Sequence, residues 1–332
     1  MDKLKVAVIG TGAMGKNHAR VYSEISNADL VAVCDSNKET AKSIADKHKI
    51  DYYTNYKEML NNERIEAVSV CVPTEFHKKV ATDVIKNKVN VLVEKPIAAT
   101  VNEAKEIISE AEKNKVKLMI GHIERFNPVV IELKRRIRNN KLGNIYNVHC
   151  ARMGPTAQRI TDVGVIIDLA IHEIDVLKYL INSKIKRIYA ETAQKIHSTH
   201  EDLLIGTIRF ENNILGVINS NWLTPKIVRE ISVAGEKGMF VADYFKQELF
   251  FYENEFVKKK LRHKFYSMMV LEGKKTAIKI KNSEPLKNEL IAFADCCLND
   301  KKVPITGEDG LEALYVAKKF IESSKKNEVV TL

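Results

Sequence analysis

The feature that most constrains the fold is a glycine-rich turn near the start of the chain. Residues 6–9 are apolar and mostly β-branched, which predicts a buried strand, and they run directly into Gly10-Thr11-Gly12-Ala13-Met14-Gly15 and a helix-like segment. A second apolar run at 30–34 ends at Asp35, twenty positions after Gly15. Strand, glycine turn, helix, strand and acid in this order are the fingerprint of a dinucleotide-binding βαβ unit.

Each part of this unit has a physical role. Gly10 allows the tight turn, Gly12 lets the backbone approach a pyrophosphate, and Gly15 lets helix and strand pack closely. The helix N-terminus offers free N–H groups to the phosphates. Asp35 is expected to bind the adenosine ribose, which favours NAD, but the polar residues from Ser36 onward leave NADP open. The alternative is an ordinary turn between strand and helix.

Length and composition bound the class of protein. The 332 residues suggest two domains, and 45% hydrophobic with 29% charged residues is ordinary for a globular protein in water. No stretch is long and apolar enough to span a bilayer, and the first five residues lead directly into the first predicted strand. We therefore expect a cytoplasmic protein with no membrane partner.

The chain is basic, with a formal net charge of +10 from 53 basic and 43 acidic residues. Most basic residues are interleaved with acidic ones, and the one dense cluster is Lys258-Lys259-Lys260-Leu261-Arg262-His263-Lys264. This run could bind nucleic acid or a phosphate-bearing substrate, but we interpret it as a solvated loop and expect no nucleic-acid partner. The five cysteines are odd in number and lack metal-ligand spacing, so neither a disulfide framework nor a metal site is expected.

The first 120 or so residues alternate strand and helix patterns, which predicts a doubly wound parallel sheet. After Asp35 we expect a helix at 38–47, a strand at 67–72, a helix at 75–87, a strand at 89–93, a helix from Thr100 to about 114 and a strand at 116–120. Thr100 and Glu103 have the spacing of a capping box.

The pattern changes after Arg125. Helices are expected at 128–138 and 165–180, with a strand at 145–151 between them, then strands at 185–192, 203–210, 214–222, 227–234 and 238–243, and helices at 285–298 and 308–323. Strands that follow one another without helices predict a mostly antiparallel sheet. The expected fold is α/β, with a dinucleotide-binding domain at 1–122 and an α+β domain with an open, mostly antiparallel sheet at 123–332.

Lys95 directly follows a predicted parallel strand, in the tripeptide Glu94-Lys95-Pro96. In open α/β sheets the ligand crevice lies outside the carboxyl ends of the strands, which places Lys95 near the nicotinamide end of a bound cofactor. The alternative is a surface lysine where the strand ends. Its position is suggestive because binding sites tend to be built on such loops.

Asp168 and His172 lie four positions apart in an otherwise apolar helix pattern and are expected on one face, one turn apart. Both side chains are costly to bury without partners. They could form an acid–base pair, with His172 as proton acceptor and Asp168 orienting it. They could also be two ligands of a metal site, or a structural pair for which Asp175 is a candidate partner.

Five motifs stand in a recognisable order: the glycine turn, Glu94-Lys95-Pro96, Gly121-His122-Ile123-Glu124-Arg125-Phe126-Asn127-Pro128, Asp168 with His172, and Thr306-Gly307-Glu308-Asp309-Gly310. In this order and at these separations the chain resembles the Gfo/Idh/MocA oxidoreductases along its whole length. The resemblance implies a Rossmann domain followed by a substrate domain whose sheet commonly forms a homodimer or homotetramer interface. It also implies NAD(P)-dependent oxidation or reduction at a sugar or cyclitol carbon.

By this resemblance the catalytic residues are Lys95, Asp168 and His172. His172 accepts the hydroxyl proton and Lys95 stabilises the developing alkoxide. Many members of the family have two adjacent glycines ahead of the aspartate, whereas only Gly164 stands here, so the substrate loop is expected to differ. The full set expected at the cofactor is Gly10, Thr11, Gly12, Ala13, Met14, Gly15, Asp35, Ser36, Pro73, Thr74, His77, Glu94 and Lys95.

Within the family, residues 121–128 and 152–172 look most like UDP-N-acetylglucosamine 3-dehydrogenases, which oxidise the 3-hydroxyl of a nucleotide sugar to a ketone. The basic surplus suits such a diphosphate. The expected substrate contacts are Arg125, Asn127, Arg152, Arg159 and His172, and for the arginines the alternative is surface charge or salt bridges. Two other functions stay open: an inositol or free-sugar dehydrogenase, and a non-catalytic NAD-binding regulator.

Overall fold

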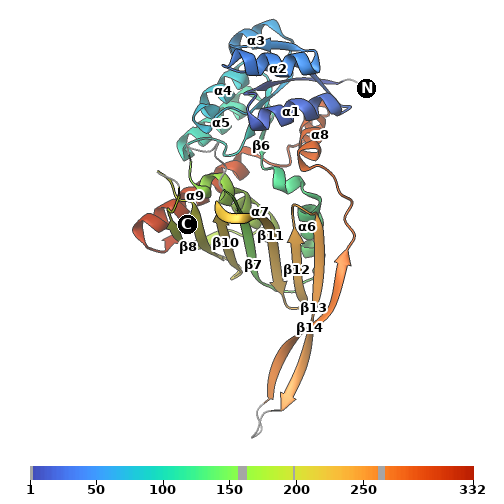
Figure 1. Ribbon diagram of the computed structural model, residues 1–332, viewed down its shortest axis with the longest axis vertical. Helices are drawn as coiled ribbons and strands as arrows, with labels where there is room; N and C mark the ends of the chain where they lie inside the picture. Colours follow the sequence, from blue (N-terminus) through green and yellow to red (C-terminus); the bar gives the residue numbers. More distant parts are fainter. Residues whose placement is uncertain (1–2, 156–162, 197–198, 261–265) are drawn as a thin grey trace. The chain divides into compact units, whose positions relative to one another are not determined.

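The computed structural model describes residues 3–155, 163–196, 199–260 and 266–332, and the chain divides into two compact units (Figure 1). The first unit comprises Met1–Phe126 and Ser283–Tyr315, and the second comprises Asn127–Asn282 and Val316–Leu332. The division expected between residues 122 and 123 placed everything after it in the second domain. The structure corrects this for residues 283–315, which pack with the first unit.

The first unit is a six-stranded parallel sheet in the order β3-β2-β1-β4-β5-β6. Its strands are β1 (Leu4–Ile9), β2 (Ala28–Cys34), β3 (Asp51–Tyr53), β4 (Ala67–Val70), β5 (Asn90–Glu94) and β6 (Leu118–Gly121). Its helices are α1 (Ala13–Glu24), α2 (Lys38–His48), α3 (Tyr56–Asn62), α4 (Thr74–Lys86), α5 (Val101–Asn114), η1 (Ile123–Phe126) and α8 (Pro285–Leu298). This order is that of a dinucleotide-binding Rossmann fold, so the predicted fold of this half is confirmed.

The strands of this sheet are buried on both faces, as a parallel sheet covered by helices requires. All four residues of β4 are buried, and so are the apolar residues of β1. The predicted capping box at the start of α5 is also confirmed, because Thr100 Oγ1 accepts from the Glu103 N–H at 3.2 Å and Glu103 Oε2 accepts from the Thr100 N–H at 2.9 Å. The short elements β3 and α3 were not predicted from the sequence.

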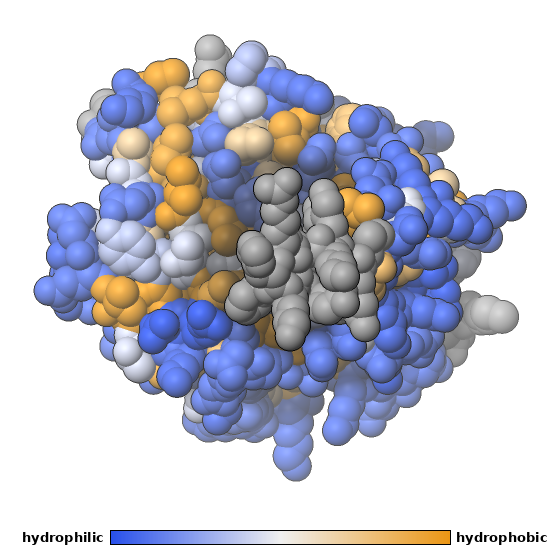
Figure 2. Space-filling model, turned by 90° about the horizontal axis from the view of Figure 1, so that it is seen from below, coloured by the Kyte–Doolittle hydropathy of each residue, from blue (hydrophilic) through white to orange (hydrophobic). Residues whose placement is uncertain are grey.

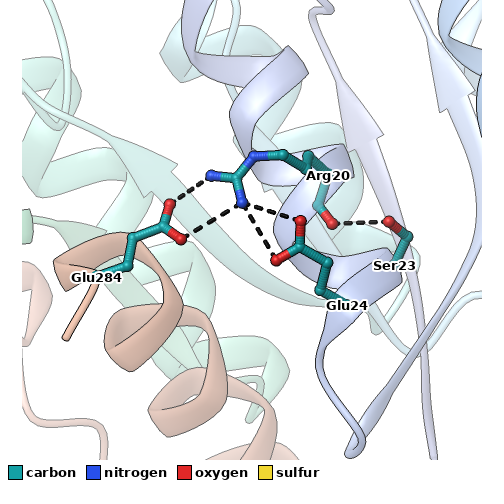
Figure 3. Close-up of polar contacts among 4 residues, drawn as sticks. All are labelled: Arg20, Ser23, Glu24 and Glu284. Carbon is teal, nitrogen blue, oxygen red and sulfur yellow. Dashed lines mark hydrogen bonds and ion pairs between the residues drawn. The ribbon is translucent and has the colours of Figure 1, made fainter.

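Helix α8 joins the first unit by packing on α1 and β1. Figure 3 shows one polar contact between these helices: Arg20 on α1 pairs with Glu24 one turn later and with Glu284, the residue that precedes α8. The two carboxylates raise the pKa of the Arg20 guanidinium. Because these side chains are more than a third exposed, the ion pair is expected to contribute little to the free energy of unfolding. It joins the start of α8 to α1.

The second unit is built on a nine-stranded sheet in the order β14-β13-β12-β11-β7-β10-β9-β8-β15. Its strands are β7 (Ile145–Pro155), β8 (Ile185–Ala193), β9 (Leu203–Phe210), β10 (Leu215–Asn221), β11 (Leu223–Gly235), β12 (Gly238–Asp243), β13 (Glu248–Lys260), β14 (Tyr266–Ile278) and β15 (Val330–Thr331). Only β7 and β10 pair in parallel within this sheet, among the described residues. The prediction of a mostly antiparallel sheet is therefore confirmed.

The helices of this unit cover one face of its sheet. They are α6 (Pro128–Arg138), η2 (Ile166–Ala170), α7 (Ile171–Ile181) and the later part of α9 (Gly307–Lys326). A Cβ on Gly206 would meet the Phe320 ring of α9, and one on Gly216 would lie 3.7 Å from Leu177 of α7. The opposite face carries Ile205 and Leu215, which are 48% and 41% exposed.

Strands β13 and β14 form a long ribbon that continues beyond the sheet (Figure 1). β13 pairs with β12 only between Glu248 and Glu253, and from Asn254 to Lys260 it pairs with β14 alone. The expectation of a loop over 258–264 is therefore wrong for Lys258–Lys260, which belong to β13, whereas residues 261–264 lie outside the described residues. Figure 2 shows hydrophobic patches among hydrophilic residues at this end of the molecule.

Candidate functional site

The glycine turn connects β1 to α1 at the carboxyl end of the strand. Gly10 has a φ of +89°, in the left-handed region that favours glycine. A Cβ on Gly15 would lie 1.8 Å from the carbonyl oxygen of Gly10, so this position also requires glycine. Around Gly12, in contrast, none of the described atoms lies within 4 Å of the place that a Cβ would take.

The open space at Gly12 and the start of α1 fit the pyrophosphate of a dinucleotide. Gly12 is the N-cap of α1, and within the described part of the chain no side chain caps this helix end. The N–H groups of the first turn, which begins with the exposed Ala13 and the half-buried Met14, therefore remain for a ligand. Such an uncapped N-terminus attracts phosphate through its N–H groups and its partial positive charge.

Replacing Gly12 with alanine is expected to weaken NADH binding roughly 10- to 100-fold, because a methyl group would occupy the space of the pyrophosphate. Its φ of −64° is acceptable to alanine, so the free energy of unfolding should stay nearly unchanged. Gly15→Ala should instead destabilise the fold by about 3 kcal/mol or more. Fluorescence titration with NADH and urea unfolding of both variants test this. Equal destabilisation by the two changes would contradict the assignment of the space to a ligand.

Asp35, the residue after β2, turns its carboxylate toward the glycine turn. Its Oδ2 accepts hydrogen bonds from Thr11 N–H at 2.7 Å and Thr11 Oγ1 at 2.9 Å, and its Oδ1 accepts from Asn37 N–H at 2.9 Å. A carboxylate offers about four acceptor positions, so one on Oδ1 remains for a ribose hydroxyl. Thr11 is fully buried and acts through Asp35, while Ser36 lies exposed beside it.

The loops after β4 and β5 are joined by His77. Its Nδ1 lies 2.8 Å from the Pro96 carbonyl oxygen and its Nε2 lies 2.9 Å from the Val72 carbonyl oxygen. Burial lowers the pKa of this ring, although both backbone contacts oppose the shift. Both ring nitrogens thus face protein oxygens, so His77 links the two loops, and its expected contact with the cofactor stays a prediction. Pro73 is the exposed N-cap of α4 and Thr74 its half-buried first residue, and their contact with the cofactor stays a prediction.

Lys95 is the one partly exposed residue within 91–98, all of which the structure describes. The preceding Glu94 is only 7% exposed, and both of its carboxylate oxygens bond inside the protein, one with His18 and one with the Lys95 N–H. Burial raises the pKa of Glu94, but the bond with His18 and the neighbouring Lys95 outweigh it, so the net shift is downward. Glu94 therefore supports the backbone of Lys95, and its expected contact with the cofactor stays a prediction.

In the second unit, Asp168 and His172 lie at the junction of η2 and α7. Between residues 164 and 177, which are all described, only these two are partly exposed. η2 is a turn of π-helix in which the Ile171 N–H reaches back five residues to the Ile166 carbonyl oxygen. The expectation of one regular α-helix over 165–180 is therefore wrong in its first turn. Such wide turns are frequent at functional sites.

The loop before η2 is held by Glu201. The Val165 N–H donates to the Glu201 carbonyl oxygen at 2.9 Å and the Ile166 N–H donates to Oε1 at 3.3 Å. A Cβ on Gly164 would lie 2.1 Å from the same Oε1, so glycine at this position allows the carboxylate to approach. Glycine at position 164 is thus explained by the close approach of the Glu201 carboxylate. The role of Glu201 in holding this loop was not predicted from the sequence.

Arg152 on β7 forms a buried ion pair with Glu173 of α7. Its Nε lies 2.5 Å from Glu173 Oε1, and the two residues are 5% and 0% exposed. The guanidinium also lies 5.9 Å from the centre of the Tyr244 ring, at the limit of a cation–π contact. The structure therefore gives Arg152 a structural role in this ion pair, and its expected substrate contact stays a prediction. The second residue of the pair, Glu173, directly follows His172.

Arg125 and Asn127 also have structural partners. Arg125 Nη2 donates to Asp309 Oδ1 at 3.0 Å, within the first unit. Asn127 is the N-cap of α6, where its Oδ1 accepts from Val129 N–H at 3.2 Å and its Nδ2 donates to the Tyr244 carbonyl oxygen at 3.2 Å. Both residues thus have partners within the protein, and their contact with a substrate stays a prediction. Arg159 lies outside the described residues.

The structure thus places the residues expected at the cofactor at the carboxyl ends of β1, β2, β4 and β5. Lys95 belongs to the first unit, and Asp168 and His172 belong to the second, so their action on one substrate stays a prediction. Among the described residues, no group of three His, Cys, Asp or Glu side chains is placed to hold a metal ion. None of the helices in the described chain could cross a membrane.

A Rossmann sheet whose first strand runs into a glycine turn without a side-chain cap is the architecture of a dinucleotide-binding protein, and here it is combined with a helix-backed antiparallel sheet. A family model described as "Oxidoreductase family, NAD-binding Rossmann fold" matches residues 4–122, and its companion, "Oxidoreductase family, C-terminal alpha/beta domain", matches residues 134–332. The chain belongs to the Gfo/Idh/MocA oxidoreductase family. It is an NAD-binding oxidoreductase.

Relatives match along nearly the whole chain. An uncharacterized oxidoreductase of Bacillus subtilis, YrbE, is 27% identical over 95% of this chain and 93% of its own. A myo-inositol 2-dehydrogenase of Thermotoga maritima is 26% identical over 97% of both chains. The solved structure of UDP-N-acetylglucosamine 3-dehydrogenase GnnA from Acidithiobacillus ferrooxidans has a TM-score of 0.85 at 22% identity, covering 98% of this chain and 99% of that one. This last likeness is one of fold.

Proposed function

We propose that the protein oxidises the 3-hydroxyl of a nucleotide sugar of the UDP-N-acetylglucosamine type to a 3-keto sugar, with NAD as oxidant. The observation that carries the choice of residues is selective exposure. Lys95, Asp168 and His172 are each a partly exposed polar residue within an otherwise buried segment of the described chain. Buried polar groups need partners, and those that keep a solvent-facing side are available to a ligand.

In this proposal each residue moves or stabilises one charge. His172 accepts the proton of the substrate hydroxyl, and Asp168 orients its ring. Lys95 places a positive charge where the alkoxide oxygen develops. When bound, NAD would be held by the glycine turn and Asp35, and it would supply the hydride acceptor for the same carbon. The protein's own contribution is thus proton acceptance on one side of the carbon and charge stabilisation at its oxygen.

The preference for a nucleotide sugar rests on two supports. Residues 121–128 and 152–172 look most like UDP-N-acetylglucosamine 3-dehydrogenases, and GnnA, which has the same fold, carries that name. A net charge of +10 suits a diphosphate. Arg125 and Arg152 no longer count toward this preference, because both are engaged within the protein.

A second candidate, an inositol dehydrogenase, is favoured by the names of sequence relatives. The Thermotoga maritima relative that spans 97% of both chains is a myo-inositol 2-dehydrogenase. The same catalytic residues would serve a cyclitol carbon, since the chemistry at the hydroxyl is unchanged. The two candidates therefore differ in substrate contacts and not in mechanism.

A substrate panel with NAD and NADP, followed by nicotinamide absorbance, tests the proposal. We expect turnover with UDP-N-acetylglucosamine and NAD, with kcat/KM at least about 100-fold above that for inositol or glucose. Turnover of inositol or glucose without turnover of the nucleotide sugar would contradict it. Binding of NAD without any turnover would favour a non-catalytic regulator.

A further inference from the structure

A buried imidazole on α1 is tied to a buried carboxylate at the end of β5. His18 is 0% exposed, and its Nε2 lies 2.9 Å from Oε1 of Glu94. Because a carboxylate of lowered pKa is an acceptor, Nε2 must carry the hydrogen. The other oxygen, Oε2, accepts the backbone N–H of Lys95 at 3.2 Å. One carboxylate therefore links α1 to the backbone of Lys95.

The space for this carboxylate is provided by β6. In the parallel register of β5 and β6, Gly121 lies opposite Glu94. A Cβ at Gly121 would lie 3.1 Å from Oε1 and 3.2 Å from the carboxyl carbon, which is tighter than ordinary contact. The absence of a side chain at this position thus lets Glu94 turn toward His18.

The charged surroundings of Glu94 come from several elements. His18 faces it from α1, Lys95 follows it in the chain, and both influence its pKa. Burial raises the pKa of Cys71, after β4, and the negative charge of Glu94 adds to this shift; the same charge opposes the lowering that burial causes in the pKa of His77 on α4. The Glu94 carboxylate therefore interacts electrostatically with titratable groups from α1, α4 and the loop after β4, as well as with Lys95.

We propose that His18 is a positioning residue for Lys95, acting through Glu94. The bond from α1 fixes the carboxylate, and the carboxylate fixes the backbone of Lys95 relative to the glycine turn from which α1 starts. A lysine side chain has a long flexible stem, so a defined backbone origin and counter-charge decide where its ammonium group lies. Misplacement of a reacting group by about 1 Å can cost 100-fold in rate. The inference rests on the role of Lys95 in the proposed function.

Three variants of α1 separate positioning from stability. His18→Phe removes the donor and keeps the bulk of the ring, and His18→Gln restores an N–H donor toward Glu94. Tyr22→Phe is the matched control, because it removes another buried bond of the same helix, from Tyr22 Oη to Ser69 Oγ at 2.9 Å. Gly121→Ala places a methyl group on β6 that should displace the Glu94 carboxylate. This variant replaces His18→Phe in both measurements if His18→Phe fails to fold.

The first measurement needs neither cofactor nor substrate. In hydrogen-exchange mass spectrometry of the free protein, the Lys95 amide should exchange about 10-fold faster or more in His18→Phe and Gly121→Ala, because its acceptor is released. The rate should stay near the wild-type value in His18→Gln and Tyr22→Phe. Unchanged exchange in His18→Phe and Gly121→Ala would overturn the link through Glu94, whatever the substrate proves to be.

The second measurement uses the substrate of the panel that gives turnover. His18→Phe should lower kcat about 10- to 100-fold with a dissociation constant for NADH within about 3-fold of wild type, and His18→Gln should recover most of the loss. Tyr22→Phe should keep kcat within about 2-fold while its melting temperature falls. A loss of kcat in Tyr22→Phe equal to that in His18→Phe, or no recovery in His18→Gln, would overturn the positioning role and leave the proposed function standing.

Discussion

Replacing Arg152 with methionine is expected to lower the free energy of unfolding by about 3–5 kcal/mol. The change removes the guanidinium that pairs with Glu173, a carboxylate that is 0% exposed. Bringing a charged carboxylate into the interior costs several kcal/mol, and in the wild type the guanidinium compensates for this cost at an N–O distance of 2.5 Å. Urea unfolding followed by circular dichroism measures the difference.

The double variant Arg152→Met/Glu173→Leu is the control for this prediction. It removes both charges and fills the space with apolar groups, so most of the lost stability should return. A double variant as unstable as Arg152→Met would contradict the ion pair as the cause. An Arg152→Met protein that unfolds like the wild type would show that the interior adapts to the lone carboxylate.

Replacing Lys95 or His172 with alanine is expected to lower kcat by about 100- to 10,000-fold while leaving the dissociation constant for NADH nearly unchanged. Each change removes the side chain that is partly exposed within a buried segment and keeps the backbone that surrounds it. In the proposed function the cofactor is held by the glycine turn and Asp35, which neither change touches. Steady-state kinetics and NADH fluorescence titration measure the two quantities separately.

Two variants in exposed positions are matched controls. Lys78→Ala removes a surface lysine that pairs with Glu106, and His149→Ala removes an exposed histidine of β7. Both should keep kcat within about 2-fold, since surface ion pairs contribute little. Loss of NADH binding in His172→Ala would contradict its role as a proton acceptor, and full turnover in Lys95→Ala would contradict the role of that lysine.

The first half of the fold is predictable from sequence because its signals are local. Gly10, Gly12 and Gly15 stand within six residues, and the structure displays a spatial reason for glycine at Gly10 and Gly15 and open space at Gly12. The strands and helices after them are each marked by a continuous apolar run or an amphipathic repeat. The ribbon of β13 and β14 lacks such a mark, because charged residues interrupt its pattern.

A candidate site residue can be picked from sequence by its own side-chain chemistry and its position in a motif. The structural partner of that residue cannot be predicted in this way when the partner lies far away in the chain. Arg125 and Arg152 had the charge expected of substrate contacts, but their partners Asp309 and Glu173 lie 184 and 21 positions away in the chain. Asp168 and His172 are four positions apart in the sequence whether the segment forms an α-helix or a turn of π-helix. Their spacing therefore could not predict the π-helical turn η2. His18 lies on the buried stripe of α1 together with Gly15, Ala19 and Tyr22, where its partner on β5 gives no sequence signal.

The division of the chain has a consequence for its synthesis. The first unit is completed by Ser283–Tyr315, so α8 leaves the ribosome only after the 127–282 segment of the second unit. At about 5–20 residues per second, this is a delay of roughly 10–30 s. During that interval the faces of α1 and β1 that later receive α8 stay uncovered. The two units are thus made in a nested order, and the amino-terminal one, although begun first, can reach its final packing only after most of the other has been translated.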